Sequence, residues 1–129
     1  MTEFALKKDT GLTFEQALEK VPAALSEEGF GVLTEIDVKA TLKKKLDADF
    51  RNYRILGACN PKAAHRALSH ELDVGVMMPC NVVVYERDDG KATVLAVDPM
   101  QTMAAKAEGE VQQVAEGVQQ GLTRALGRL

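Results

Sequence analysis

The stretch MMPCNVVVYERDDGKATVLAV, residues 77–97, decides the fold because two apolar runs rich in β-branched residues flank the dipeptide Asp89-Gly90. Asp-Gly is a favoured two-residue turn between antiparallel strands. We therefore predict a hairpin with one strand at residues 77–86 and the other at residues 92–97. A two-residue turn also sets the register of the strands. It pairs Asp88 with Lys91, Glu86 with Thr93, Val84 with Leu95 and Val82 with Val97.

This register gives the hairpin two largely apolar faces. We expect helices of the same chain to cover one of them. A large apolar face is seldom left in water, so the other face must also be covered. Its cover is either a second subunit, which would make the protein a homodimer, or the remaining helices of the same chain. The sequence pattern does not decide between these two covers. The first face carries Cys80, Val82, Val84, Leu95 and Val97, and the second carries Val83, Tyr85, Val94 and Ala96, with Asn81 and Asp98 as a polar pair at the open end of the hairpin.

Turn and cap residues divide the N-terminal part of the chain into a strand and a helix. We expect Gly11 to end a first strand at residues 4–8. Thr13 and Gln16 form a capping box, which predicts that a helix starts there. Pro22 lies inside this helix and is expected to kink or split it, because proline removes one backbone hydrogen bond.

The rest of the chain continues the alternation of strands and helices, which predicts the order β-α-β-α-β-α-β-β-α. One two-layer domain over residues 1–129 accounts for this order, of the α+β or α/β class, with one mixed or largely antiparallel sheet of about five strands packed with helices. The remaining elements are a strand at residues 30–36, a helix capped by Asp37 through Leu46, a strand at residues 53–59, a helix starting at Asn60-Pro61 with Ala64, Ala67 and Leu68 inward, and a last helix from Val111 after an irregular or helical lead-in at residues 99–107.

Composition and charge exclude several classes of function. Hydrophobic residues make up 46% and charged residues 27% of the chain, which is the balance of a folded globular domain. A net charge of -3 gives no broad positive field, so we expect no nucleic-acid partner. No apolar run approaches the length of a membrane span, and residues 1–4, MTEF, do not resemble a secretory signal. We therefore expect a cytoplasmic protein without a membrane partner.

The two cysteines matter either for chemistry or as packing in the core. Cys59 precedes the Asn60-Pro61 helix start, where the helix dipole would stabilise a thiolate. His65 lies more than one helical turn further on, so no nucleophile and base pair is evident. Cys59 and Cys80, with Met77 and Met78, are soft ligands that suit Cu(I), but their spacing is not that of a metal loop. Plain core packing is the simpler interpretation of these four side chains.

The sequence has none of the familiar local signatures of enzymes. It contains no phosphate-binding loop, no dinucleotide fingerprint, no zinc-protease motif and no GxSxG elbow. The basic run at residues 43–45 is followed by Asp47 and Asp49 and reads as a solvated helix end. We therefore expect no cofactor and no metal site, and the sequence leaves open whether the protein is an enzyme.

Three segments carry a resemblance to a known family. They are EEGFGVLTEIDVKATLKKKL at residues 27–46, YRILGACNPKAAHRAL at residues 53–68 and GVMMPCNVVVYE at residues 75–86. The chain resembles the bacterial and archaeal family catalogued as domain of unknown function 302, most specifically at Cys59-Asn60-Pro61 and Pro79-Cys80-Asn81. The resemblance implies a two-layer α/β domain and a homodimer, and it carries no established activity and no catalytic residue.

Three hypotheses of function follow. The first is a small dimeric binding or accessory protein, whose ligand lies near the Cys59 helix start and the Asn81 end of the hairpin, where backbone amides would hold a small anion. The second is a thiol-dependent redox enzyme or copper carrier that uses Cys59 and Cys80. The third is a purely structural or assembly role, which needs no polar pocket. The candidate site residues are Cys59, Asn60, Cys80, Asn81 and Asp98, and Cys59 is the candidate catalytic residue.

Overall fold

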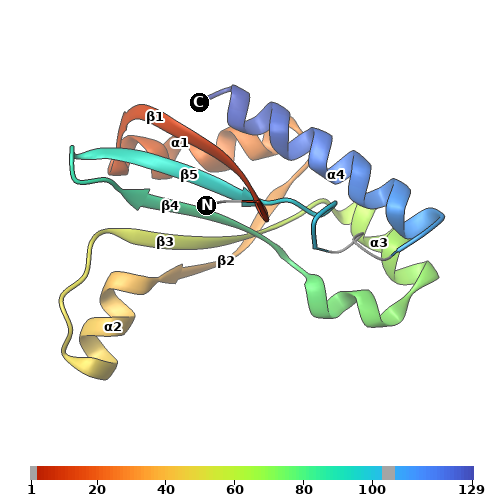
Figure 1. Cartoon of the computed structure of the whole chain (residues 1–129), viewed down its shortest axis with the longest axis horizontal. Coiled ribbons are helices and arrows are strands. Elements are labelled where there is room, and N and C mark those ends of the chain that lie inside the picture. The colour runs from red at the N-terminus through yellow and green to blue at the C-terminus, as the bar shows by residue number, and fades with distance from the viewer. Residues whose placement is uncertain (1–2, 103–106) are drawn as a thin grey trace.

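The computed structural model describes residues 3–102 and 107–129, which form one antiparallel five-stranded sheet packed with helices (Figure 1). The strand order is β1-β5-β4-β3-β2, and every neighbouring pair is antiparallel. The α+β alternative of the predicted fold class and the order of elements are therefore confirmed. The elements are β1 (Ala5–Thr13), α1 (Phe14–Glu27), β2 (Gly31–Asp37), α2 (Val38–Leu46), β3 (Tyr53–Cys59), α3 (Pro61–His70), the 3₁₀ helix η1 (Leu72–Met77), β4 (Cys80–Glu86), β5 (Lys91–Val97) and α4 (Glu110–Gly127).

Helices α1 and α4 cover one face of the sheet, and the core lies between them and the strands (Figure 1). Both helices present an apolar stripe at helical spacing. On the sheet, the central strands β4 and β5 supply buried valines and alanines, so this layer excludes water along its length. The buried side chains include Phe14, Ala17 and Val21 of α1, Val114, Val118 and Leu122 of α4, and Val82, Val84, Val94 and Ala96 of the sheet.

The hairpin is confirmed, but its predicted register is wrong by one residue. Arg87 closes the loop with Lys91, whose carbonyl oxygen accepts the Arg87 amide at 2.7 Å, so the loop has three residues ending at Gly90. Gly90 has φ +82°, the left-handed conformation that this kind of loop requires at its last position. The observed pairs are Val82 with Ala96, Val83 with Leu95, Val84 with Val94, Tyr85 with Thr93 and Glu86 with Ala92.

The shift of one residue exchanges the faces of β5, because side chains alternate along a strand. Val94 and Ala96, predicted on the second face, lie in the core under α1 and α4. Leu95 and Val97, predicted in the core, alternate onto the opposite side and are only partly buried, although Val97 still packs against the core. The predictions for Cys80, Val82 and Val84 on the helix-covered face and for Val83 and Tyr85 on the other are confirmed.

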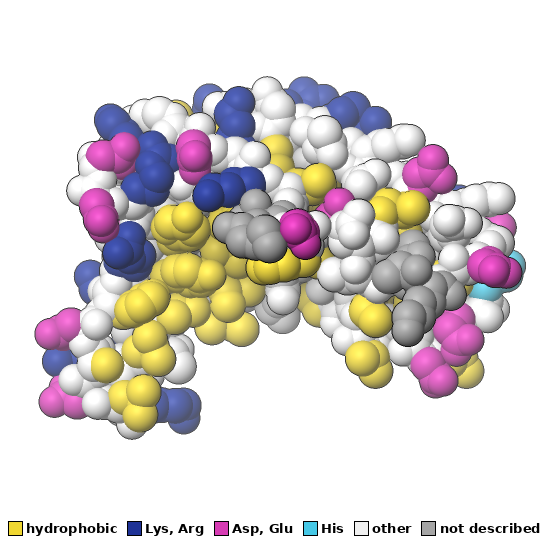
Figure 2. All heavy atoms as spheres, viewed as in Figure 1, with side chains coloured by type: hydrophobic (Ala, Val, Ile, Leu, Met, Phe, Trp, Pro, Cys, Tyr) yellow, Lys and Arg dark blue, Asp and Glu magenta, His cyan; other side chains and the backbone are white. Residues whose placement is uncertain are grey.

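The second face of the sheet, which we call the open face, is not covered by helix α1 or α4 (Figure 1). Among the described residues, α2 and η1 project at its two ends, and apolar side chains gather in the hollow between these projections (Figure 2). The aromatic ring of Tyr53 stacks on that of Tyr85, with centroids 5.7 Å apart. The open face carries Tyr53 and Ile55 of β3, Val83 and Tyr85 of β4, and Leu95 and Val97 of β5.

The predicted end of the first strand at Gly11 and the predicted split of the helix at Pro22 are wrong, while a kink at Pro22 stays a prediction. Gly11 does not end the first strand, because the chain accommodates it in an irregularity of the β1–β5 register between Asp9 and Thr13. Pro22 does not split α1, which is one continuous helix with Pro22 on its exposed side. The capping box is confirmed, since Thr13 and Gln16 each accept a hydrogen bond from the other's backbone amide.

The strand predicted from Met77 begins only at Cys80. Residues Leu72–Met77 form η1 instead, which the Met78 amide closes by donating to the Gly75 carbonyl oxygen at 3.1 Å. Pro79 has no amide to offer a sheet, so pairing starts after it. The predicted cap residues Asp37 and Asn60 are both confirmed.

The lead-in to the last helix starts with a turn, in which the Gln101 amide donates to the Asp98 carbonyl oxygen at 3.0 Å. Part of the predicted lead-in, residues 103–106, lies outside the described residues. Helix α4 begins at Glu110, one residue before the predicted start. Among the helices described, none is both long enough and apolar enough to cross a membrane.

Candidate functional site

A pocket of about 290 Å³ lies where β3 ends and α3 begins, and we call it the α3 pocket. Helix α3 supplies one wall and α4 another, since Val114 and Val118 face into it. The ring of Phe30 forms a further wall and lies close to α4. A β-carbon at Gly121 would lie 2.9 Å from that ring, so the glycine allows the approach. Nearly all of the lining is apolar, including Leu33, Ala63, Ala64, Leu68 and Met78.

Both cysteines line this pocket and both are free thiols. The backbone brings them together, because Ala58 pairs with Cys80 across the β3–β4 ladder and Cys59 follows Ala58. Cys59 is half-buried, whereas Cys80 is buried. Burial raises the pKa of the Cys80 thiol to about 11, and the neighbouring Cys59 adds to the rise. Cys80 is therefore protonated at neutral pH and is a poor nucleophile.

A thioether lies beside the two thiols. Met78 lines the α3 pocket with Cys59 and Cys80, so three of the four soft ligands noted in the sequence meet there. Met77, the fourth, lines a separate depression next to η1. Among the described residues, no three acidic, histidine or cysteine side chains gather as a metal site would require.

Asn60 lies at the mouth of α3 as its N-terminal cap. Its side-chain oxygen accepts the amide of Ala63 at 3.2 Å, and Pro61 follows at the first helical position. One of the first amides of the helix is thus already bonded within the chain. The side chain of Asn60 still borders the α3 pocket.

Asn81 and Asp98 do not form the predicted polar pair. The observed register places Asn81 on the open face, where it is exposed, while Asp98 is buried beneath α4. One carboxylate oxygen of Asp98 accepts the amide of Met100 at 2.9 Å and the side-chain nitrogen of Gln119 at 2.9 Å. Asp98 thereby fixes the turn after β5 to α4. Neither Asn81 nor Asp98 is among the described residues that line the α3 pocket.

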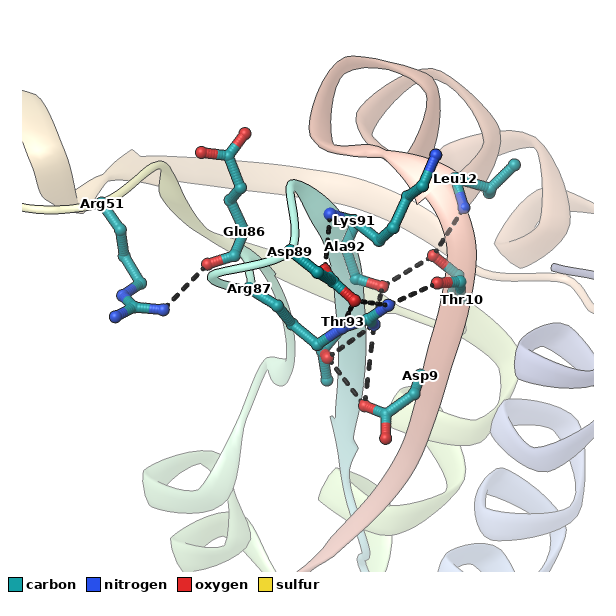
Figure 3. Close-up of polar contacts among 10 residues, drawn as sticks. All are labelled: Asp9, Thr10, Leu12, Arg51, Glu86, Arg87, Asp89, Lys91, Ala92 and Thr93. Carbon is teal, nitrogen blue, oxygen red and sulfur yellow. Dashed lines mark hydrogen bonds and ion pairs between the residues drawn. The ribbon is translucent and has the colours of Figure 1, made fainter.

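Sequence reasoning missed a polar cluster at the hairpin loop (Figure 3). The guanidinium of Arg87 donates to the carbonyl oxygens of Thr10 at 2.9 Å and of Ala92 at 2.8 Å. Thr93, fully buried, donates its hydroxyl proton to Asp9 at 2.7 Å and accepts a hydrogen bond from Arg87 at 3.2 Å. These bonds join β1 to the hairpin. Each partner is within the chain, and we assign the cluster to structure.

Comparisons with known proteins agree with this fold. No curated protein matches the chain. A solved structure described as an uncharacterized conserved protein DUF302 from Bacillus stearothermophilus is similar over 98% of each chain, with 29% sequence identity and a TM-score of 0.89. The family described as Domain of unknown function DUF302 matches residues 6–129. The chain therefore belongs to the DUF302 family.

Proposed function

We propose that this protein binds a small, mainly apolar molecule in the α3 pocket. The observation that carries the proposal is the pocket itself, whose walls combine Phe30, Leu68 and Val118 with only a few polar groups. Its volume of about 290 Å³ suits a small ligand and lies near the lower limit of ordinary ligand sites. Burial of apolar surface would supply most of the affinity.

The polar end of such a ligand would lie beside Cys59 and Asn60. The first amides of α3 and the positive end of its dipole favour a negatively charged group at this position. The side-chain oxygen of Asn60 already accepts a hydrogen bond from the amide of Ala63. The anionic group of the ligand therefore mainly orients the ligand and contributes the smaller share of the affinity. A medium-chain carboxylate has both features, an apolar tail and a small anionic end.

The proposal is tested with octanoate and 1-octanol, which share a chain length and differ in charge. Each is titrated into isotopically labelled protein while amide signals are followed by NMR. We expect both to shift the signals of Cys59 and Ala64, and octanoate to bind more tightly. Ala64→Leu, which fills the pocket, should weaken binding by about tenfold or more. Ser69→Leu, on the exposed side of the same helix, should leave it unchanged. Equal binding by both variants would refute the proposal.

A second candidate function is favoured by the meeting of Cys59, Cys80 and Met78 in one pocket. These are the ligands that Cu(I) prefers, and in the reducing cytoplasm, where we place this protein, both cysteines would stay as thiols. Metal binding would have to displace the proton of Cys80, whose raised pKa opposes it. Competition for Cu(I) with a chromophoric chelator tests this, and Cys59→Ser should abolish any binding. The structural or assembly role stays a hypothesis, and failure of both ligand tests would favour it.

A further inference from the structure

The open face is an apolar surface at the bottom of a hollow (Figure 2). Its side chains are only partly buried, although they come from the three central strands β3, β4 and β5. Central strands normally need cover on both faces when both are apolar. Within the described residues, only the two end projections approach this face (Figure 1).

The first projection, residues 38–50, consists of α2 and the segment after it. None of the residues of α2 is buried, and the nine-residue helix lies mainly against the edge strand β2 and its neighbour β3. Two of its large apolar side chains are exposed to solvent, Leu46 at 70% and Phe50 at 43%, although the Phe50 ring also lies against that of Tyr53. So short a helix is marginal without packing on its apolar side. Part of the apolar surface of this projection therefore stays uncovered within the described part of the chain.

The second projection, residues 71–77, is η1 with its cap. It also exposes large apolar side chains, since Leu72 is 82% and Val76 is 89% exposed. The two projections differ in charge. In the first projection Lys43 forms ion pairs with Asp47 and Asp49 at 2.9 and 3.3 Å. Lys39, Lys44 and Lys45 leave this projection with a net positive charge, whereas the start of η1 carries Glu71 and Asp73.

We propose that a second copy of this chain covers the open face, with α2 of each copy lying in the hollow of the other beside η1. We place the second copy by a twofold axis perpendicular to the plane of Figure 2. This rotation exchanges the two ends of the open face, so the basic projection of one copy meets the acidic projection of the other. The same operation brings the projection that exposes Leu46 to the projection that exposes Val76 and Leu72. The hydrophobic and the charged contacts favour the same arrangement, and the twofold axis makes each of them occur twice.

A second copy fits these features better than an unrelated partner does. The surface carries a basic apolar projection and an acidic apolar projection on either side of an apolar hollow, so it is complementary to itself. A basic helix or an acidic peptide would match only one half. The inference does not rest on ligand binding, because the α3 pocket and the open face are lined by different side chains.

The test is sedimentation equilibrium of the whole chain at micromolar concentration. We expect twice the 14.0 kDa mass of one chain. Leu46→Glu and Val76→Glu should each raise the dissociation constant by about tenfold or more. Both side chains are exposed in the single chain, so the fold should tolerate the changes. Ala23→Glu, at an exposed position of α1, is the control and should leave the dimer intact.

A charge exchange tests the orientation. Lys45→Glu alone and Asp73→Lys alone should each weaken the dimer, and the double variant should recover most of the loss. A monomeric parent protein overturns the proposal. The proposal is also overturned if Leu46→Glu and Val76→Glu leave the dissociation constant of the dimer as low as the control variant does. The interface would then lie elsewhere, for example at the β1 edge.

Discussion

At the scale of single residues, burial separates the two thiols of the α3 pocket. We predict that iodoacetamide alkylates Cys59 in the native protein, whereas Cys80 reacts only after unfolding. Cys80 is buried and its pKa of about 11 leaves almost no thiolate at neutral pH. Mass spectrometry of peptides from native and urea-unfolded protein measures both rates. Equal protection of both cysteines would make them core residues and remove support for the thiol hypothesis.

Glu28 gives the stability a dependence on pH. Its carboxylate accepts hydrogen bonds from Arg124 and Arg128, both at 2.7 Å, and these arginines hold the pKa of Glu28 below its ordinary value, Arg128 most. A lowered pKa in the folded state stabilises the protein above the ordinary pKa of glutamate, and this contribution is lost as the pH falls through the folded-state pKa.

We therefore predict that Glu28→Gln lowers the free energy of unfolding at neutral pH and flattens its fall on acidification. Urea denaturation at a series of pH values from neutral to acidic measures the difference. Glu27→Gln, at the neighbouring exposed position, is the matched control and should leave the slope unchanged. Parallel pH curves for the parent and Glu28→Gln would contradict the assignment.

At the scale of elements, neighbouring positions of β4 test the two faces. Val84 is fully buried under the helices, so Val84→Asp should cost about 3 to 5 kcal/mol of unfolding free energy. Val83 lies on the open face and is partly exposed, so Val83→Asp should cost much less in dilute protein. Denaturant titration compares the two. Similar losses would mean that the sheet is covered on both faces within one chain.

Local signals in the sequence predicted most elements correctly. The capping box at Thr13, the caps at Asp37 and Asn60, and Pro61 at the first helical position each depend on groups within one turn of the chain. Such groups determine helix starts wherever the helix finally packs. The β-α-β-α-β-α-β-β-α order followed from them.

The errors arose where the local structure depends on packing against segments that are distant in the sequence. Asp89-Gly90 suits both a two-residue and a three-residue loop, and the choice depends on how β5 packs against the helices and β1. Gly11 continues β1 because β5 supplies partners on either side of the irregularity. The Arg87 cluster and the bond of Gln119 to Asp98 join residues far apart in the chain, so no local pattern announced them. Cys59 and Asn60 were found at the pocket because both are adjacent to a helix start.

At the scale of the whole molecule, the ligand pocket and the proposed dimer surface should work independently. Leu46→Glu changes a side chain that does not line the α3 pocket, so we predict that it dissociates the dimer and leaves octanoate affinity unchanged. Isothermal titration of octanoate into the parent and the variant measures this. A loss of affinity in the monomeric variant would show that the second copy shapes the pocket.

The place of β1 beside β5 has a consequence for synthesis on the ribosome. Thr10 of β1 donates its hydroxyl proton to the carbonyl oxygen of Ala92, 82 positions later in the chain. At ordinary elongation rates the first strand therefore emerges roughly 4 to 16 s before its partner exists. During this delay its backbone is unpaired, and the charged run Lys7, Lys8 and Asp9 would discourage pairing with other nascent chains. Completion of the sheet must then wait until β5 has been synthesised.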